Sequence, residues 1–135
     1  MGTDKYKVLL VDDSLDDRFF ERILLERSPK FVVIAEACDG QEALDYLQGN
    51  GELPDIMLLD LKMPRKNGFD VLRWIQTANL GNLTVAVMSG SSLAEDITES
   101  LALGAHAYFK KTSSKEENEQ MIADIEKLLH ERKTI

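Results

Sequence analysis

The amino-acid sequence predicts an α/β fold, a doubly wound parallel sheet of five strands with five helices. Two observations lead to this class. Five short apolar runs alternate along the chain with five segments of helical spacing, and the connections between them are short. A run that is apolar throughout is typical of a strand covered on both faces, as in a parallel sheet. Alternating strands and helices of this kind are joined by right-handed crossovers.

Length and composition fit one compact domain. The chain has 135 residues, of which 44% are hydrophobic and 30% charged, as in ordinary globular domains. We therefore expect a single domain over residues 1–135, with its core at about 5–132 and no output domain after the last helix. The expected strands are the apolar runs Lys7 to Asp12, Phe31 to Ala35, Asp55 to Asp60, Leu83 to Ser89, and Ala107 to Lys110.

Apolar residues at helical spacing predict which face of each helix is buried. In chain order the expected stripes are Phe19, Phe20, Ile23 and Leu24; Ala43, Leu44 and Leu47; Val71, Leu72 and Ile75; Ile97 and Leu101; and Met121, Ile122, Ile125, Leu128 and Leu129. Phe19, Phe20 and Trp74 are accordingly interpreted as packing residues.

Side-chain acceptors followed three residues later by Glu predict where helices begin. These pairs are Asp39 with Glu42, Ser92 with Glu95, and Ser114 with Glu117. Glycines predict two helix ends, because a residue past a helix C-terminus often adopts the left-handed conformation that glycine tolerates. The predicted ends are Gly49-Asn50-Gly51 and Gly104.

Three aspartates follow two of the predicted strands. Asp12 and Asp13 come directly after Val8-Leu9-Leu10-Val11, and Asp60 follows Ile56-Met57-Leu58-Leu59. If these strands are neighbours, their carboxylates converge, and like charges so close need a shared proton or a bound cation. The pattern therefore predicts a divalent metal site. Taken alone, Asp12 and Asp13 could equally cap the first helix.

The charge balance excludes several classes of partner. The formal net charge is -8 and no basic stripe interrupts it, so we expect no nucleic-acid or anionic-membrane surface.

No apolar stretch approaches the roughly 20 residues that span a bilayer, and the segment from Met1 to Lys7 lacks the apolar core of a signal peptide. A cytoplasmic location is expected.

Four motifs in the order and spacing of this sequence resemble the receiver domain of two-component response regulators. They are Val-Asp12-Asp13-Ser, Leu-Leu-Asp60-Leu-Lys-Met-Pro64, Met-Ser89-Gly90, and Gly104-Ala-His-Ala-Tyr108-Phe-Lys-Lys111. The resemblance covers essentially the whole chain and extends to stand-alone, chemotaxis-regulator-like receivers, including those that partner phytochrome-type histidine kinases. It implies a flavodoxin-like sheet with strand order 2-1-3-4-5, whose ligands bind beyond the carboxyl ends of the strands.

The resemblance implies a phosphoacceptor site that depends on Mg2+. Asp60 would accept the phosphoryl group, and Asp13 and Asp60 would bind Mg2+ directly. Asp12 would act largely through coordinated water, and the backbone carbonyl of Lys62 would complete the protein ligands. Mg2+ suits such a site because it prefers oxygen ligands and keeps several waters.

The same resemblance assigns roles at the ends of the last two strands. Lys111 would supply a fixed positive charge to the phosphoryl oxygens, and Ser89 a hydroxyl donor. Motif spacing selects Lys111 over the adjacent Lys110, although either could be a solvated surface lysine. Tyr108 would be a switch residue that turns inward when Ser89 moves, or an ordinary half-buried aromatic side chain.

The implied function is that of a signalling protein and not an enzyme, although it assists its own phosphorylation and dephosphorylation. It would take a phosphoryl group from a sensor histidine kinase or a phosphotransfer protein, and contact a downstream protein through the face between Leu93 and Leu129. The alternative is a phosphorylation-independent interaction module on the same fold. A metal-dependent phosphatase ranks last, because haloacid-dehalogenase-like enzymes place a second aspartate where this chain has Lys62.

Two positions depart from the family pattern or bear on it. Thr112 follows the lysine where receivers commonly have proline, often after a cis bond. Because a cis bond before a non-proline residue costs about 2.5–4 kcal/mol, we expect a trans Lys111–Thr112 bond or a strained loop. Lys62 places a cation at the mouth of the site. We expect Lys62→Ala to change the rate at which the phosphorylated form hydrolyses, measured by intact mass against time; an unchanged rate would remove this side chain from the mechanism.

Overall fold

The sheet has the predicted topology. The computed structural model describes residues 4–133, and its five strands are all parallel in the order β2-β1-β3-β4-β5. This confirms the expected flavodoxin-like order. The strands are β1 (Tyr6–Val11), β2 (Phe31–Ala37), β3 (Ile56–Leu59), β4 (Thr84–Ser89) and β5 (Ala107–Lys110).

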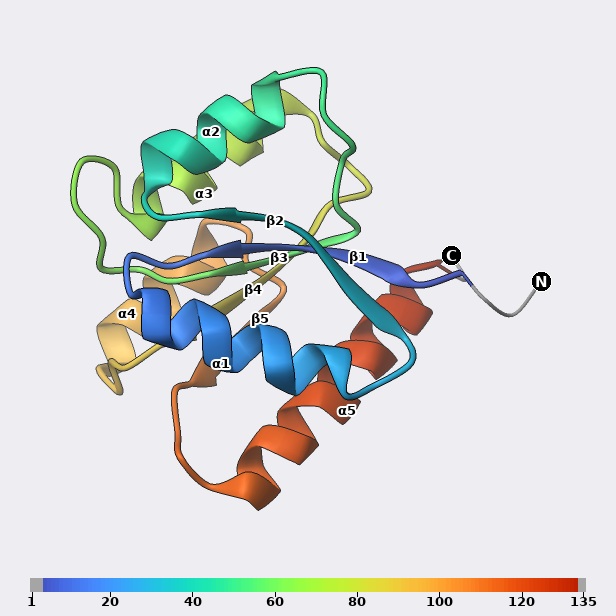
Figure 1. Cartoon of the computed structure of the whole chain (residues 1–135). Helices are drawn as coiled ribbons and strands as arrows, with labels where there is room; N and C mark the ends of the chain where they lie inside the picture. Colours follow the sequence, from blue (N-terminus) through green and yellow to red (C-terminus); the bar gives the residue numbers. More distant parts are fainter. Residues whose placement is uncertain (1–3, 134–135) are drawn as a thin grey trace.

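Helices cover both faces of this sheet. Figure 1 shows α2 and α3 above one face, and α1 and α5 against the other. The helices are α1 (Leu15–Glu26), α2 (Gly40–Gln48), α3 (Gly68–Ala78), α4 (Ala94–Ala102) and α5 (Lys115–Lys133). No helix in this described part of the chain is both long and apolar enough to cross a membrane.

Alternation along the strands divides the core into two layers, because successive strand residues point to opposite faces. In β1, Leu9 and Val11 pack with residues of α2 and α3, whereas Val8 and Leu10 pack with residues of α1 and α5. All four side chains are at most 1% exposed. The predicted burial on both faces is therefore confirmed for β3, β4 and most of β1, whereas the edge strands β2 and β5 are partly exposed.

The predicted buried stripe of α1 is wrong for three of its four residues. Phe19, Phe20 and Ile23 are 62%, 46% and 40% exposed, and Leu24 alone of the predicted set is buried. The inner face of α1 instead carries Glu21, Leu24 and Leu25, which stand at i, i+3 and i+4 and so share one side of a helix. The aromatic side chains consequently face outward, together with Leu15, which is 68% exposed.

Two of the three predicted helix starts are confirmed. In α2 and α5 the expected side chain accepts a hydrogen bond from the backbone three residues on, Asp39 from Glu42 and Ser114 from Glu117. The predicted start of α4 at Ser92 is wrong, because Leu93 is the N-cap and makes no side-chain cap. The hydroxyl of Ser91, which precedes Ser92, accepts a hydrogen bond from the Leu93 N–H instead.

The helix ends agree with the prediction in part. Gly104 follows the end of α4 with a φ of 106°, which is the left-handed conformation expected there. Gly49 ends α2 as predicted, but its φ of -80° needs no glycine. The left-handed residue after α3 is Asn79, with a φ of 57°, where no glycine marks the end of the helix.

Candidate functional site

Three carboxylates meet where β1 and β3 end. Asp12 and Asp13 follow β1, Asp60 follows β3, and these strands are hydrogen-bonded neighbours in which Val11 pairs with Leu59. One oxygen from each carboxylate lies within 4.8 Å of the others. Asp12 and Asp60 are buried and Asp13 is exposed. The predicted convergence is confirmed.

The backbone on either side fixes Asp60. Its N–H donates to the Val11 carbonyl at 2.9 Å, and its Oδ1 accepts from the Leu61 N–H at 2.9 Å. The first residue of α3, Gly68, packs directly on this backbone, where a Cβ would stand 2.4 Å from the Asp60 carbonyl oxygen. Only glycine fits there without displacing Asp60, so the start of α3 positions the carboxylate.

Lys111 brings a positive charge into this cluster from the end of β5. Its Nζ lies 2.6 Å from Oδ2 of Asp12, 2.8 Å from Oδ2 of Asp17 and 3.7 Å from Oδ2 of Asp60. Burial alone would lower the pKa of Lys111, but its bonds with Asp12 and Asp17 raise it, so the amine stays charged. Lys110 is exposed. The structure thus places Lys111 at the site, as motif spacing predicted.

The negative charge of the clustered carboxylates favours the binding of a cation. Burial raises the pKa of Asp60 to about 6, partly opposed by Lys111 and reinforced by Asp12. Oδ2 of Asp12 is buried and accepts no directed hydrogen bond, although Lys111 approaches it as an ion pair. Three converging carboxylates supply the oxygen ligands that Mg2+ prefers. The residues present therefore fit this ion.

One side chain of β4 and one of β5 form hydrogen bonds to the same loop residue, Ser91. Ser89, the last residue of β4, is 1% exposed, and its Oγ accepts from the Ser91 N–H at 3.1 Å. Tyr108 is half-buried, and its hydroxyl donates to the Ser91 carbonyl at 2.8 Å. The two proposed switch positions are thus linked through Ser91, in the loop between β4 and α4.

The two departures from the family pattern lie at the rim. No peptide bond between residues 4 and 133 is cis, so Lys111–Thr112 is trans, as predicted. The Thr112 hydroxyl donates to Glu117, and its carbonyl accepts from the Asn118 side chain. The side chain of Lys62 is exposed.

Sequence reasoning missed two acidic side chains of α1. Asp17 accepts a hydrogen bond from Lys111 at 2.8 Å. Glu21, one turn further on, is 3% exposed and lines a cavity of about 60 Å³ with Lys111 and Asn118. Burial and the nearby Asp12 raise the pKa of Glu21 to about 8. The sequence signal for the burial of Glu21 was its spacing: Leu24 and Leu25 follow it by three and four residues and so share its side of the helix.

These features agree with what comparisons with known proteins find. Residues 8–123 match the response regulator receiver domain, and the chain belongs to this family. Among solved structures it is similar to the phosphorylated cyanobacterial phytochrome response regulator RcpA, with 32% identity, coverage of 93% of this chain and 94% of that one, and a TM-score of 0.80. It is also similar to the Mn(2+)-bound response regulator Rcp1, with 30% identity, coverage of 90% and 91%, and a TM-score of 0.77.

Similarity to curated proteins covers only part of their length. The nitrate/nitrite response regulator protein NarL of Escherichia coli K12 is 31% identical over 92% of this chain and 53% of NarL. A protein-glutamate methylesterase/protein-glutamine glutaminase of Pyrococcus horikoshii is 35% identical over 90% of this chain and 34% of its own length. The present chain thus spans between about a third and a half of the length of these relatives.

Proposed function

We propose that this chain is a stand-alone receiver of the cytoplasm. Residues 1–135 would act as one domain that takes a phosphoryl group onto Asp60 from the phosphohistidine of a sensor kinase or phosphotransfer protein, in a Mg2+-dependent reaction. The observation that carries the proposal is the meeting of Asp12, Asp13 and Asp60 within 4.8 Å, with the Lys111 amine 3.7 Å from Asp60. Similarity to a phosphorylated receiver and to a metal-bound one supports it.

The chemistry uses the residues in distinct roles. An oxygen of Asp60 attacks phosphorus while the phosphorus–nitrogen bond to the donor histidine breaks. Asp13, Asp60 and the Lys62 carbonyl would hold Mg2+, with Asp12 acting through water. When bound, Mg2+ offsets the negative charge of the phosphoryl oxygens.

Two further residues stabilise the transferred group. Lys111 supplies a second positive charge to the phosphoryl oxygens, and the Ser89 hydroxyl donates to another of them. Because the pKa of Asp60 is about 6, its carboxylate is mostly ionised at neutral pH and can act as the nucleophile.

The proposal is tested by incubating the protein with acetyl phosphate or phosphoramidate and Mg2+, followed by intact mass measurement. We expect the wild type to gain the mass of one phosphoryl group and Asp60→Asn to gain none, because an amide cannot form the acyl phosphate. Asp124→Asn, a change at an exposed position of α5, is the control and should behave as wild type. An unmodified wild type would refute the proposal and favour the phosphorylation-independent interaction module.

We propose that phosphorylation is communicated to a downstream protein through the face between Leu93 and Leu129. Ser89 and Tyr108 meet at Ser91, immediately before α4, so movement of the Ser89 hydroxyl toward a phosphoryl group changes the bonding of this loop. α4 is lightly anchored, with Ser100 as its only buried residue. Leu101 in α4 is 44% exposed, and Leu93, the residue that caps the start of α4, is 52% exposed.

This face should change its dynamics when Asp60 is modified, because phosphorylation shifts the balance between two arrangements of the loop. We expect amide hydrogen exchange within residues 93–129 to differ between the protein with Mg2+ alone and with Mg2+ and phosphoramidate. Exchange in β2, on the far edge of the sheet, should stay the same. The same experiment on Asp60→Asn is the control. A response confined to the loops around Asp60 would place the output surface elsewhere.

A further inference from the structure

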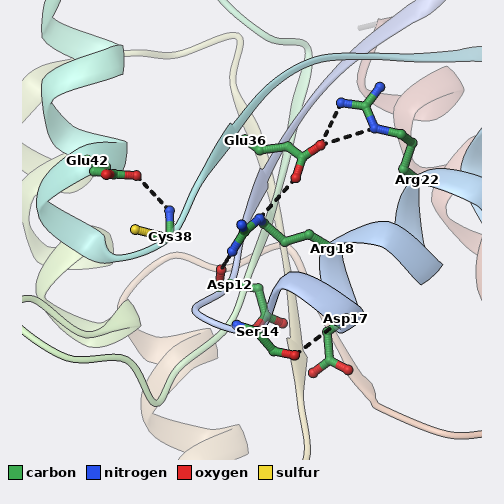
Figure 2. Close-up of polar contacts among 8 residues, drawn as sticks. All are labelled: Asp12, Ser14, Asp17, Arg18, Arg22, Glu36, Cys38 and Glu42. Atoms are coloured by element: carbon green, nitrogen blue, oxygen red, sulfur yellow. Dashed lines mark hydrogen bonds and ion pairs between the residues drawn. The ribbon is translucent and has the colours of Figure 1, made fainter.

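The side chain of Arg18 links α1, β2 and the loop that carries Asp12 and Asp13. Its Nη1 donates to the main-chain carbonyl of Asp12 at 2.5 Å, and its Nε donates to Oε1 of Glu36 at 2.9 Å (Figure 2). The Arg18 side chain is 13% exposed. A guanidinium held at two of its nitrogens is fixed in orientation, because its donors form a planar fork.

Glu36 is itself held from the other side. Arg22, one helical turn after Arg18, donates from Nε and Nη2 to Oε2 of Glu36 at 3.1 Å and 2.6 Å (Figure 2). Hydrogen bonds from Arg22 and Arg18 lower the pKa of Glu36 despite its partial burial. Glu36 therefore remains charged and keeps Arg18 in place.

The carbonyl that Arg18 holds belongs to the peptide bond between Asp12 and Asp13. Asp12 is also fixed by its N–H, which donates to the Ala37 carbonyl, and by its Oδ1, which accepts from the Ser14 N–H. Asp13 is different, because within the described chain its carboxylate makes no hydrogen bond or ion pair and is exposed. The direction of the Asp13 side chain therefore depends on the plane of the preceding peptide.

We propose that Arg18 is a positioning residue for the cation site. By fixing the Asp12–Asp13 peptide, it presents the Asp13 carboxylate to a cation beside Asp12 and Asp60. The positive charge of Arg18 would by itself disfavour a nearby cation, and its pairing with Glu36 offsets that charge. The contribution of Arg18 is thus orientation of a ligand, as for other side chains that support metal ligands from behind. This inference rests on the proposed Mg2+ dependence.

The test compares two arginines that share one partner. Arg18→Ala removes the bond to the Asp12 carbonyl and one bond to Glu36. Arg22→Ala removes the bonds to Glu36 and an ion pair with Glu26, but no bond to the Asp12 carbonyl. We expect Arg18→Ala to weaken Mg2+ binding, measured by isothermal titration calorimetry, by roughly 10-fold or more. Arg22→Ala should change it less than about 2-fold, with a comparable shift in melting temperature. Equal losses in both variants, or no loss in Arg18→Ala, would overturn the proposal.

A second variant and a metal-free measurement separate this inference from the proposed function. Arg18→Lys retains a donor that can reach the Asp12 carbonyl, and should recover part of the affinity. Without Mg2+, amide exchange at Asp13 and Ser14 should be faster in Arg18→Ala than in Arg22→Ala. If wild type binds no Mg2+, the proposed function fails, while faster exchange still supports positioning by Arg18. Unchanged exchange in Arg18→Ala would contradict it.

Discussion

Lys111→Met is expected to slow phosphorylation by acetyl phosphate by roughly 100-fold while strengthening Mg2+ binding. The first effect follows because the variant lacks the cation 3.7 Å from Asp60, and a preorganised charge at a reacting centre typically contributes about 100-fold or more. The second follows because the Lys111 amine lies 2.6 Å from Oδ2 of Asp12 and competes for that oxygen with water bound to the metal. Opposite changes in the two quantities distinguish a catalytic charge from a merely structural one.

These two effects are measured by intact mass against time and by calorimetric titration with Mg2+. Lys110→Met is the matched control, because Lys110 is the preceding residue and is exposed. It should leave the phosphorylation rate and the Mg2+ affinity as in wild type. Parallel weakening of both in Lys111→Met would indicate that Lys111 holds the loops together and does not act on the phosphoryl group.

Glu21→Gln is expected to stabilise the protein, and more so in alkaline solution. Burial raises the pKa of Glu21 from 4.5 to about 8, so between these values the folded state binds more protons than the unfolded state. The free energy of unfolding therefore falls as pH rises through this window and stays lowered above it. Removing the carboxyl abolishes that loss, which we expect to be about 5 kcal/mol near pH 9 and small near pH 5.

Urea unfolding at several pH values, with the metal absent, measures this difference. The control is Glu119→Gln, which removes a carboxylate from an exposed position of α5 and should change stability little at any pH. A pH dependence that is the same in Glu21→Gln and wild type would show that Glu21 ionises normally in the folded protein.

The fold and the acidic cluster could be predicted from the sequence because both depend on simple patterns. Strands buried on both faces are apolar throughout, as in Val8-Leu9-Leu10-Val11. In a parallel sheet, residues just after neighbouring strands necessarily meet. The order of the motifs then predicted Asp60 and Lys111 as site residues, and the structure brings their charged groups to 3.7 Å.

The part of the site that α1 contributes, Asp17 and Glu21, could not be predicted, for two physical reasons. Lys111 and Asp17 are separated by 94 positions, and no local pattern reports such a contact. In α1, apolar residues occupy more than one side, so periodicity alone did not indicate that Leu25, and not Phe19, faces the core. Glu21 was overlooked because it lies on the side of α1 that carries Leu24 and Leu25, which the predicted stripe did not follow.

The outward apolar side of α1 has a kinetic consequence for this chemistry. Leu15 stands two positions after Asp13, and Phe19 and Ile23 continue the same row along the helix. Binding of a protein to this row would bring it close to the loop that carries Asp13, because the row begins at Leu15. Such binding would be expected to lengthen the lifetime of an acyl phosphate on Asp60, if it limits the access of water to the loop that carries Asp13.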